Sequence, residues 1–312
     1  MAAATRTGGS MKAALVFGLT TLDIVNICQT FPEEDEDVRV LNQYWQKGGN
    51  AANTSEVLAQ LGLEAHLFSA FAVDNAMSDF AKNSLDNSNV VTKHCVALKS
   101  SGFPTSCCIV SKSTGSRTIL HGRNDMPELT LEHFKMIDFA SGYSWVHFEG
   151  RGFPHLKDMV HEAVRIRKDR GLSFKISIEF EKPQRHDFLI SSGIAEAADV
   201  LFISKDFAKR LGFSDAKDAI LNAKNKLSLN HDLTVICPWG ESGASAIDEF
   251  GNTFHSDSFP PVNVIDTLGA GDTFIAGIIF SMSTGSSVGE ALVFGCQLAG
   301  KKCGQYGFKD LT

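Results

Sequence analysis

The segment VIDTLGAGDTF, residues 264–274, carries two glycines and an aspartate between an apolar, β-branched run and a helical pattern. We interpret it as the point where a buried strand gives way to a helix. In an open parallel sheet, ligands bind beyond the carboxyl ends of the strands, where loops lead into helix N-termini. The segment therefore predicts an α/β fold with a ligand site at residues 269–272.

Short apolar runs that alternate with helical patterns extend this prediction along the chain. The helical patterns lie at residues 52–62 and 155–171. The expected strands are AALVFG (13–18), EAHLFSAF (64–71), YSWVHFEG (143–150), FKISIEF (174–180), DVLFIS (199–204) and DLTVICPWG (232–240). This alternation is typical of a mostly parallel central sheet with helices on both faces.

Two segments interrupt the alternation and look like antiparallel strands. Residues 24–47 contain a proline, an acidic run and the alternating VRVLNQYWQ, and residues 103–120 form a hairpin pattern around STGS. We expect them to form a small β-sheet lid. The predicted domains are a large α/β unit of residues 11–23, 48–100 and 124–312, a lid of residues 24–47 and 101–123, and a disordered N-terminus, residues 1–10.

Composition favours a small-molecule partner in the cytoplasm. The net charge of -7 and the pI near 5.8 disfavour binding to nucleic acid or an anionic membrane, which needs clustered Lys and Arg. The apolar run at residues 274–282 is too short to span a bilayer, and the N-terminal MAAATRTGGS lacks the apolar core of a secretory signal. The seven cysteines form no C-x-x-C pair, and we expect them to be reduced core residues.

The glycines at 269 and 271 suggest an anion cradle that contains a carboxylate. Without side chains, they let backbone N–H groups approach an anion at the positive end of a helix. Asp272 would repel a phosphate there unless it acts on an incoming hydroxyl, as the residue that accepts the alcohol's proton does in phosphoryl transfer. Two alternatives stay open: Asp272 only caps the helix, or the segment is a dinucleotide fingerprint, although it lacks the third glycine.

A second glycine pair opens the segment KGGNAANTSEVLAQLG, residues 47–62. Gly48 and Gly49 precede a helix whose first turn holds Asn50 and Asn53. Amides suit sugar hydroxyls because each offers a donor and an acceptor; simple helix capping by Asn50 is the alternative. Asp23, which we place just after the first strand, could accept hydrogen bonds from two hydroxyls, or could be a turn residue.

Together these motifs resemble the two signatures of the ribokinase family of sugar kinases, also called the phosphofructokinase B family. The matching segments are GGNAANTSEVLAQLG (48–62) and DTLGAGDTF (266–274). HFEGR (147–151), FISKDFAKRLGF (202–213) and FGCQLAGKKCG (294–304) are similar to members that act on ketohexoses. The resemblance covers nearly the whole chain after the first ten or so residues, and it implies a ribokinase-like fold.

The resemblance implies transfer of the γ-phosphate of ATP to the 1-hydroxyl of D-fructose or a related ketose, giving a sugar 1-phosphate and ADP. Asp272 would be the catalytic base, and the backbone of Gly269, Ala270 and Gly271 the anion hole. The implied sugar contacts are Asp23, Gly49, Asn50, Asn53 and Asp272. The implied ATP contacts are Arg117, Lys205, Gly240, Glu241, Ser242, Gly243, Cys296 and the three anion-hole residues.

The resemblance also implies metals and a partner. Magnesium is expected with ATP because a metal must neutralise the phosphates, but its protein ligands are not assigned. Where the family carries N-x-x-E near its magnesium site, this chain has Ser204, Lys205, Asp206 and Phe207. Potassium activation is expected through carbonyls near Asp266 and Thr267. Two lids would clasp each other in a homodimer.

Three other functions stay open. A kinase of another sugar or of a nucleoside would use the same generic amides and carboxylates. A sugar-binding protein of the same fold would have no need for a base at Asp272. A dinucleotide oxidoreductase is the third, and the incomplete glycine fingerprint argues against it.

Overall fold

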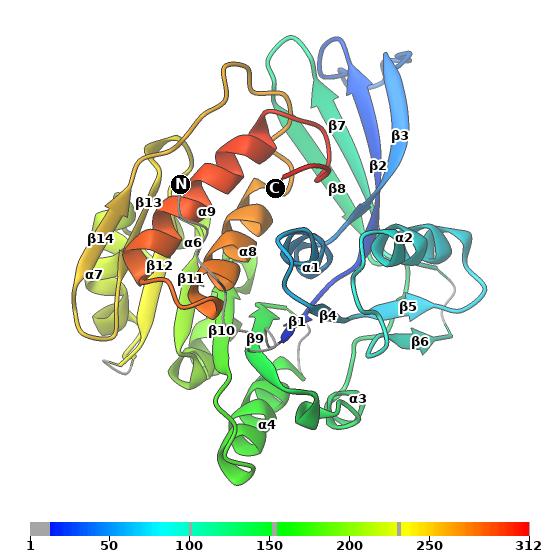
Figure 1. Ribbon diagram of the computed structural model, residues 1–312. Coiled ribbons are helices and arrows are strands. Elements are labelled where there is room, and N and C mark those ends of the chain that lie inside the picture. The colour runs from blue at the N-terminus through cyan, green and yellow to red at the C-terminus, as the bar shows by residue number, and fades with distance from the viewer. Residues whose placement is uncertain (1–12, 100–101, 152–154, 230–231, 312) are drawn as a thin grey trace, which may run out of the picture.

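The computed structural model describes residues 13–99, 102–151, 155–229 and 232–311 (Figure 1). The predicted disordered N-terminus, residues 1–10, lies outside these ranges. The main sheet has eight strands in the order β14-β13-β12-β11-β10-β9-β1-β4. Its strands are β1 Ala13–Phe17, β4 Ala65–Phe68, β9 Tyr143–Glu149, β10 Lys175–Phe180, β11 Val200–Ile203, β12 Thr234–Pro238, β13 Ala244–Ile247 and β14 Thr253–Ser256.

The first six of these strands pair in parallel, and only β13 and β14 pair antiparallel. Successive residues of each strand point to opposite faces, so one strand supplies two cores. In β1, Leu15 and Phe17 belong to one apolar cluster, and Ala14 and Val16 belong to the other. A strand buried on both faces needs a continuous apolar run, which is the pattern that the sequence carries.

Helices cover both faces of the sheet, as predicted, and Figure 1 shows both layers. Helices α1, α8 and α9 pack together on one face, and α4 and α7 lie on the other. The helices are α1 Asn50–Gln60, α2 Ala76–Asn87, α3 Leu131–Lys135, α4 Leu156–Asp169, α5 His186–Ser191, α6 Lys205–Arg210, α7 Ala216–Lys226, α8 Ala270–Ser283 and α9 Val288–Cys303. None of these helices is long and apolar enough to cross a bilayer.

A second, four-stranded sheet projects from this body, above α1 and α2 in Figure 1. It consists of β3 Asn42–Gly48, β2 Thr21–Cys28, β7 Thr105–Ser111 and β8 Arg117–Gly122, in that order. The predicted hairpin around STGS is the β7–β8 turn. The register places Gln46, Asp23, Ser106 and His121 in one row across the sheet.

The small sheet begins earlier than the predicted boundary at residue 24. Its strand β2 starts at Thr21, so Asp23 is an internal strand residue and does not lie in a turn after β1. Only three residues, 18–20, separate β1 from β2. The sequence shows no polar or glycine-rich linker at this point because the chain passes directly from one buried strand to the next. The division into two domains stays a prediction.

Two strand predictions were wrong. The run at 64–71 is two strands, because the chain leaves the main sheet at Ser69 and continues as β5 Ala70–Ala72, which pairs with β6 Val96–Leu98. The run before Asp266 is no strand: Val264 and Ile265 are exposed, and the backbone N–H of Ile265 donates to the carbonyl of Cys303, at the end of α9, at 2.8 Å. These β-branched residues find no neighbouring strand there.

The aromatic core under α3 provides a test of the packing. The ring of Phe134 has no exposed surface and contacts Phe68, Phe139 and Phe148, with centroid separations of 5.6–5.9 Å. We expect Phe134→Ala to lower the free energy of unfolding by about 3–5 kcal/mol, because it leaves a cavity in a packed core. Urea denaturation measures this loss.

Phe250→Ala is the matched control, since the Phe250 side chain is 83% exposed. The same change there should cost at most about 0.5 kcal/mol. Equal losses in the two variants would contradict the packing described here.

Candidate active site

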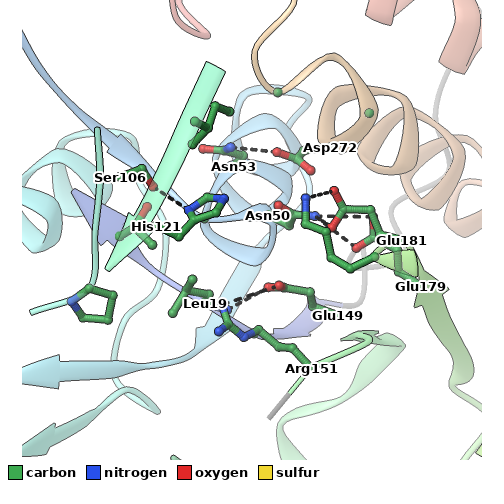
Figure 2. Close-up of a pocket in the computed structure, with 18 of the residues that line it drawn as sticks. Leu19, Asn50, Asn53, Ser106, His121, Glu149, Arg151, Glu179, Glu181 and Asp272 are labelled. Atoms are coloured by element: carbon green, nitrogen blue, oxygen red, sulfur yellow. Dashed lines mark hydrogen bonds and ion pairs between the residues drawn. The ribbon is translucent and has the colours of Figure 1, made fainter. Parts of the chain in front are cut away.

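A cavity of about 820 Å³ opens where the carboxyl ends of β1, β9 and β10 meet the small sheet. Figure 2 shows side chains from both parts of the fold facing it. Eight residues predicted for the site line this cavity: Asp23, Gly49, Asn50, Asn53, Arg117, Gly269, Gly271 and Asp272. The structure therefore brings together residues that are up to 249 positions apart (272 minus 23) in the sequence.

Glycines start both helices that meet at the cavity. Gly49 precedes α1 with a φ of 98°, and a side chain there would lie 2.1 Å from the carbonyl oxygen of Leu19. Gly269 precedes α8 with a φ of 78°, and a side chain there would lie 2.3 Å from the ring of Phe308. Any larger residue would disrupt the close approach of α1 and α8 to their surroundings.

Asp272 lies in the first turn of α8, buried, with its carboxylate toward α1. Its Oδ2 accepts a hydrogen bond of 2.7 Å from Nδ2 of Asn53. The helix-capping alternatives are wrong for both Asp272 and Asn50, because the N-caps are Gly269 and Gly49 and neither helix has a side-chain cap. The positive end of α8 favours a negative charge at this place.

Burial is the main cause of an unusual charge state at Asp272. It raises the pKa of the carboxyl to about 7. The hydrogen bond from Asn53 and the charge of Lys47 act in the opposite direction, and the charges of Glu181 and Glu149 raise the pKa further. Near neutral pH this group can both take up and release a proton.

Three glutamates in the cavity had no predicted role. Glu149 ends β9, Glu179 lies in β10, and Glu181 follows β10. Burial, and then the charges of Glu181, Asp272 and Glu149, raise the pKa of Glu179 well above its usual range. The sequence could have indicated these glutamates. They lie in HFEGR (147–151) and EFEKP (179–183), at the carboxyl ends of two predicted strands, where ligands bind in a parallel sheet.

Basic groups offset part of this negative charge. Arg151 and Arg185 lie 3.7 and 3.9 Å from Oε1 of Glu149, and Lys182 pairs with Glu181. The backbone N–H of Leu19, just after β1, donates to Oε2 of Glu149 at 2.8 Å. Two arginines, a lysine and a backbone N–H thus stabilise the carboxylates of Glu149 and Glu181 at this edge of the sheet.

The amide of Asn50 also belongs to this acidic edge. Its Nδ2 donates to Oε2 of Glu181 at 2.9 Å and lies 3.5 Å from both carboxylate oxygens of Glu179. The Asn50 amide thus holds the carboxylates of Glu179 and Glu181 near the N-terminus of α1.

On the opposite wall, the small sheet contributes Asp23. Thr21 donates to Oδ1 of Asp23 at 2.9 Å. Burial raises the pKa of Asp23, and hydrogen bonds from Ser106 and Thr21 work against that rise. Ser106 in turn lies 3.0 Å from Nδ1 of His121, which lines the cavity and was not predicted. This row of polar groups can bind several hydroxyls of one ligand.

Most residues predicted to contact ATP lie outside the lining of the cavity. Only three of them line it: Gly269, Gly271 and Arg117. The side chain of Arg117 donates to the hydroxyl of Thr267. The other seven are not lining residues, and three of them, Gly240, Glu241 and Ser242, are exposed: Ala270, Lys205, Gly240, Glu241, Ser242, Gly243 and Cys296. Lys205 follows the lining residue Ser204, and Gly240 lies two residues after Pro238. Their contact with ATP stays a prediction.

The backbone before α8 is held by internal hydrogen bonds. The N–H of Ala270 donates to the carbonyl of Thr267 at 3.2 Å. The carbonyl and Oδ2 of Asp266 accept bonds of 3.1 and 2.9 Å from Lys302, whose side chain is fully buried. In the described residues, no group of three His, Cys, Asp or Glu side chains could hold a metal ion by itself.

The raised pKa of Asp272 predicts a pH-dependent stability. Between the ordinary carboxyl pKa of 3.8 and about 7, the folded state binds a proton that the unfolded state has lost, so the free energy of unfolding falls as pH rises. Asp272→Asn removes this loss. We expect the variant to gain stability over the wild type, on the order of a few kcal/mol, between pH 4 and pH 8.

Urea denaturation across this pH range measures the gain. Asp187→Asn is the control, because the Asp187 side chain is 96% exposed, and it should not reproduce the effect. A difference between Asp272→Asn and wild type that is the same at pH 4 and pH 8 would contradict the raised pKa.

The chain is similar to known carbohydrate kinases. The model of the pfkB family carbohydrate kinases matches residues 11–311. The chain is 40% identical to ketohexokinase of Mus musculus over 307 residues, which cover 96% of this chain and 99% of that protein.

Solved structures share the fold at lower identity. The crystal structure of adenosine kinase from Sinorhizobium meliloti has a TM-score of 0.78 at 19% identity and covers 97% of both chains. The structure of Arabidopsis thaliana ribokinase complexed with ribose and ATP has a TM-score of 0.74 at 17% identity, covering 95% of this chain and 94% of that one. The expected ribokinase-like fold is thus confirmed, and the chain belongs to the pfkB family of carbohydrate kinases.

Proposed function

We propose that this protein transfers the γ-phosphate of ATP to the 1-hydroxyl of D-fructose, giving fructose 1-phosphate and ADP. The substrate rests on the full-length similarity to mouse ketohexokinase, since D-fructose is a ketohexose. The mechanism rests on one observation: a buried carboxylate, Asp272, faces the cavity from the first turn of α8.

Asp272 is the proposed general base. One carboxylate oxygen is held by Asn53, and the other accepts the proton of the sugar hydroxyl as it attacks the phosphorus. A pKa of about 7 suits this role, because a base works best when its pKa lies near the working pH. Such a base contributes about 10²- to 10⁴-fold in rate.

The remaining rate enhancement comes from positioning and charge. Gly269 and Gly271, at the start of α8, line the cavity, and backbone N–H groups there would stabilise the transferred phosphoryl group. Arg117 reaches the same loop from the small sheet and would bind the phosphates of ATP. Asp23 and the amides of Asn50 and Asn53 would bind the sugar hydroxyls.

Magnesium fits the acidic edge of the cavity. The crowding of Glu149, Glu179 and Glu181 around Asp272 shows an excess of negative charge that a divalent cation would relieve. Glu179 and Glu181 are the carboxylates proposed to hold it, together with water and the nucleotide. When bound, the ion neutralises the phosphates. Potassium activation is also part of this proposal, although Lys302 already donates to one of the expected ligands, the carbonyl of Asp266.

Kinases of other sugars or of nucleosides are the second candidate. The similarity of the fold to an adenosine kinase and to a ribokinase favours testing them. A cytoplasmic location is also proposed, since all seven cysteines are free thiols, as in a reducing compartment.

The decisive experiment measures ADP release from MgATP with D-fructose, ribose or adenosine, with and without potassium. NMR of the product then locates the phosphate. We expect turnover on D-fructose and phosphate on the 1-hydroxyl. Turnover only on another substrate would replace fructose and leave the mechanism intact, whereas no turnover on any of them would favour a binding protein.

Asp272→Asn is the companion variant. It should lower kcat by about 10²-fold or more, while the Kd for MgATP, measured by calorimetry, changes little. Full activity in this variant would remove Asp272 from the mechanism.

We further propose a homodimer formed through the small sheet. Trp45, Ile24, Cys107 and Leu120 form one cross-strand row on the face opposite the cavity row. Leu120 is 59% exposed and Trp45 44% exposed, which leaves apolar surface for a second copy of the chain.

Analytical ultracentrifugation tests the dimer. We expect the wild type to sediment with twice the chain mass and Leu120→Asp to sediment as a monomer, because a charge would be buried at the interface. Leu221→Asp on α7, also at an exposed leucine, should stay dimeric. A monomeric wild type would refute the proposal.

A further inference from the structure

We infer that Lys47 is a positioning residue for the reaction: it fixes the amide of Asn53 and, through that amide, the carboxylate of Asp272. This inference rests on the proposed function of Asp272 as the base. Lys47 lies in β3 of the small sheet, Asn53 in α1, and Asp272 in α8. A single chain of hydrogen bonds therefore joins three elements at the cavity.

The geometry of this chain is well defined. Nζ of Lys47 lies 2.6 Å from Oε2 of Glu56 and donates to Oδ1 of Asn53 at 2.7 Å. Nδ2 of Asn53 donates to Oδ2 of Asp272 at 2.7 Å. The exposed fractions of Lys47, Asn53, Glu56 and Asp272 are 2%, 5%, 8% and 7%. Water cannot readily replace contacts that are buried to this extent.

The ammonium group decides which way the amide points. An ammonium only donates hydrogen bonds, and an ionised carboxylate only accepts them. The Asn53 amide lies between the two, so its oxygen must face Lys47 and its NH₂ must face Asp272. The reversed amide would place NH₂ against the ammonium and oxygen against the carboxylate. Without Lys47, only the ionised carboxylate of Asp272 would still oppose that reversal, and a protonated Asp272, which can donate to the amide oxygen, would not oppose it.

Lys47 is itself held from several directions. Glu56 pairs with it and also accepts from Ser88, in the turn after α2, at 3.0 Å. The ring of Phe308 lies 4.7 Å from Nζ. Two anchors in the body of the fold thus fix a side chain that belongs to the small sheet, and the ammonium couples that sheet to the base.

The charge of Lys47 also acts on Asp272. The charged groups that face Asp272 are Glu149 in β9, Glu179 in β10, Glu181 after it, and Lys47. The charges of Glu181 and Glu149 raise the pKa of Asp272, and that of Lys47 lowers it. Loss of Lys47 should therefore leave the base protonated at pH values where the wild type works.

The test compares Lys47→Met with the wild type in the D-fructose kinase assay. We expect kcat to fall about 10- to 100-fold, because a misoriented group loses most of its benefit, while KM for ATP stays within about twofold. The acid limb of the kcat profile should move to higher pH. Lys47→Arg keeps the charge and the donors, and should restore much of kcat and the position of the limb.

Two controls separate positioning from folding. Lys82→Met removes a lysine that is 46% exposed and pairs with Asp86, and it should leave kcat and the pH profile unchanged. Glu56→Gln keeps an oxygen that can accept from Lys47 but removes the charge of this anchor, so we expect a loss of kcat smaller than that in Lys47→Met. An acid limb that does not move, or a kcat that does not fall, in Lys47→Met would overturn the inference.

A measurement that does not depend on kinase activity distinguishes failure of the Lys47 inference from failure of the proposed function. ¹³C NMR of labelled aspartate follows the titration of Asp272 in wild type and in Lys47→Met, and the Asp272→Asn variant assigns the signal. Lys47→Arg, which keeps the charge, should titrate like the wild type. We expect the Asp272 pKa to rise in Lys47→Met. A wild type without kinase activity would refute the proposed function, and an unchanged Asp272 pKa would refute the role of Lys47.

Discussion

The burial of one carboxylate, Asp272, at the start of α8 is the constraint on which the site depends. A buried charge needs a partner, and the Asn53 amide, 219 residues away in sequence, provides it. That bond requires α1 and α8 to begin side by side, which the glycines at 49 and 269 permit. The backbone requirements of the glycines and the electrostatic requirement of the aspartate are thus parts of one arrangement.

The parallel sheet adds the second element, a concentration of negative charge. Because parallel strands end at the same edge, Glu149 and Glu179 are brought next to each other and to the start of α8. Their mutual repulsion is opposed by Arg151, Arg185 and the N–H of Leu19. Crowding of carboxylates at one edge of the sheet lowers the stability of the fold. It also favours the binding of cations and keeps the carboxyl group of Asp272 able to exchange a proton near neutral pH.

The small sheet closes the arrangement from the other side. Its register sets Asp23, Ser106 and His121 in one row that faces the cavity, while Lys47, from the same sheet, reaches the base through Asn53. The sheet is therefore more than a cover. It supplies polar side chains to the cavity and one end of the hydrogen-bond chain, so the proposed sugar contacts and the proposed orientation of the base depend on the same strands.

The sequence by itself determined the alternation of strands and helices, the small sheet and the two glycine segments, because these follow from local periodicity and backbone preference. Eight predicted site residues line the cavity; the sequence motifs and Asp23 account for seven of them, and the family resemblance supplied Arg117. Only the tertiary structure decided that residues 64–71 divide between two sheets, that 264–265 is no strand, and that Asp23 lies within β2. It alone also revealed Lys47 and His121 as neighbours of the site, and it placed Glu149 and Glu179, whose strand-end positions the sequence did show, beside Asp272. Burial and pairing between distant segments set these features, and no local pattern encodes which distant residue a side chain will meet.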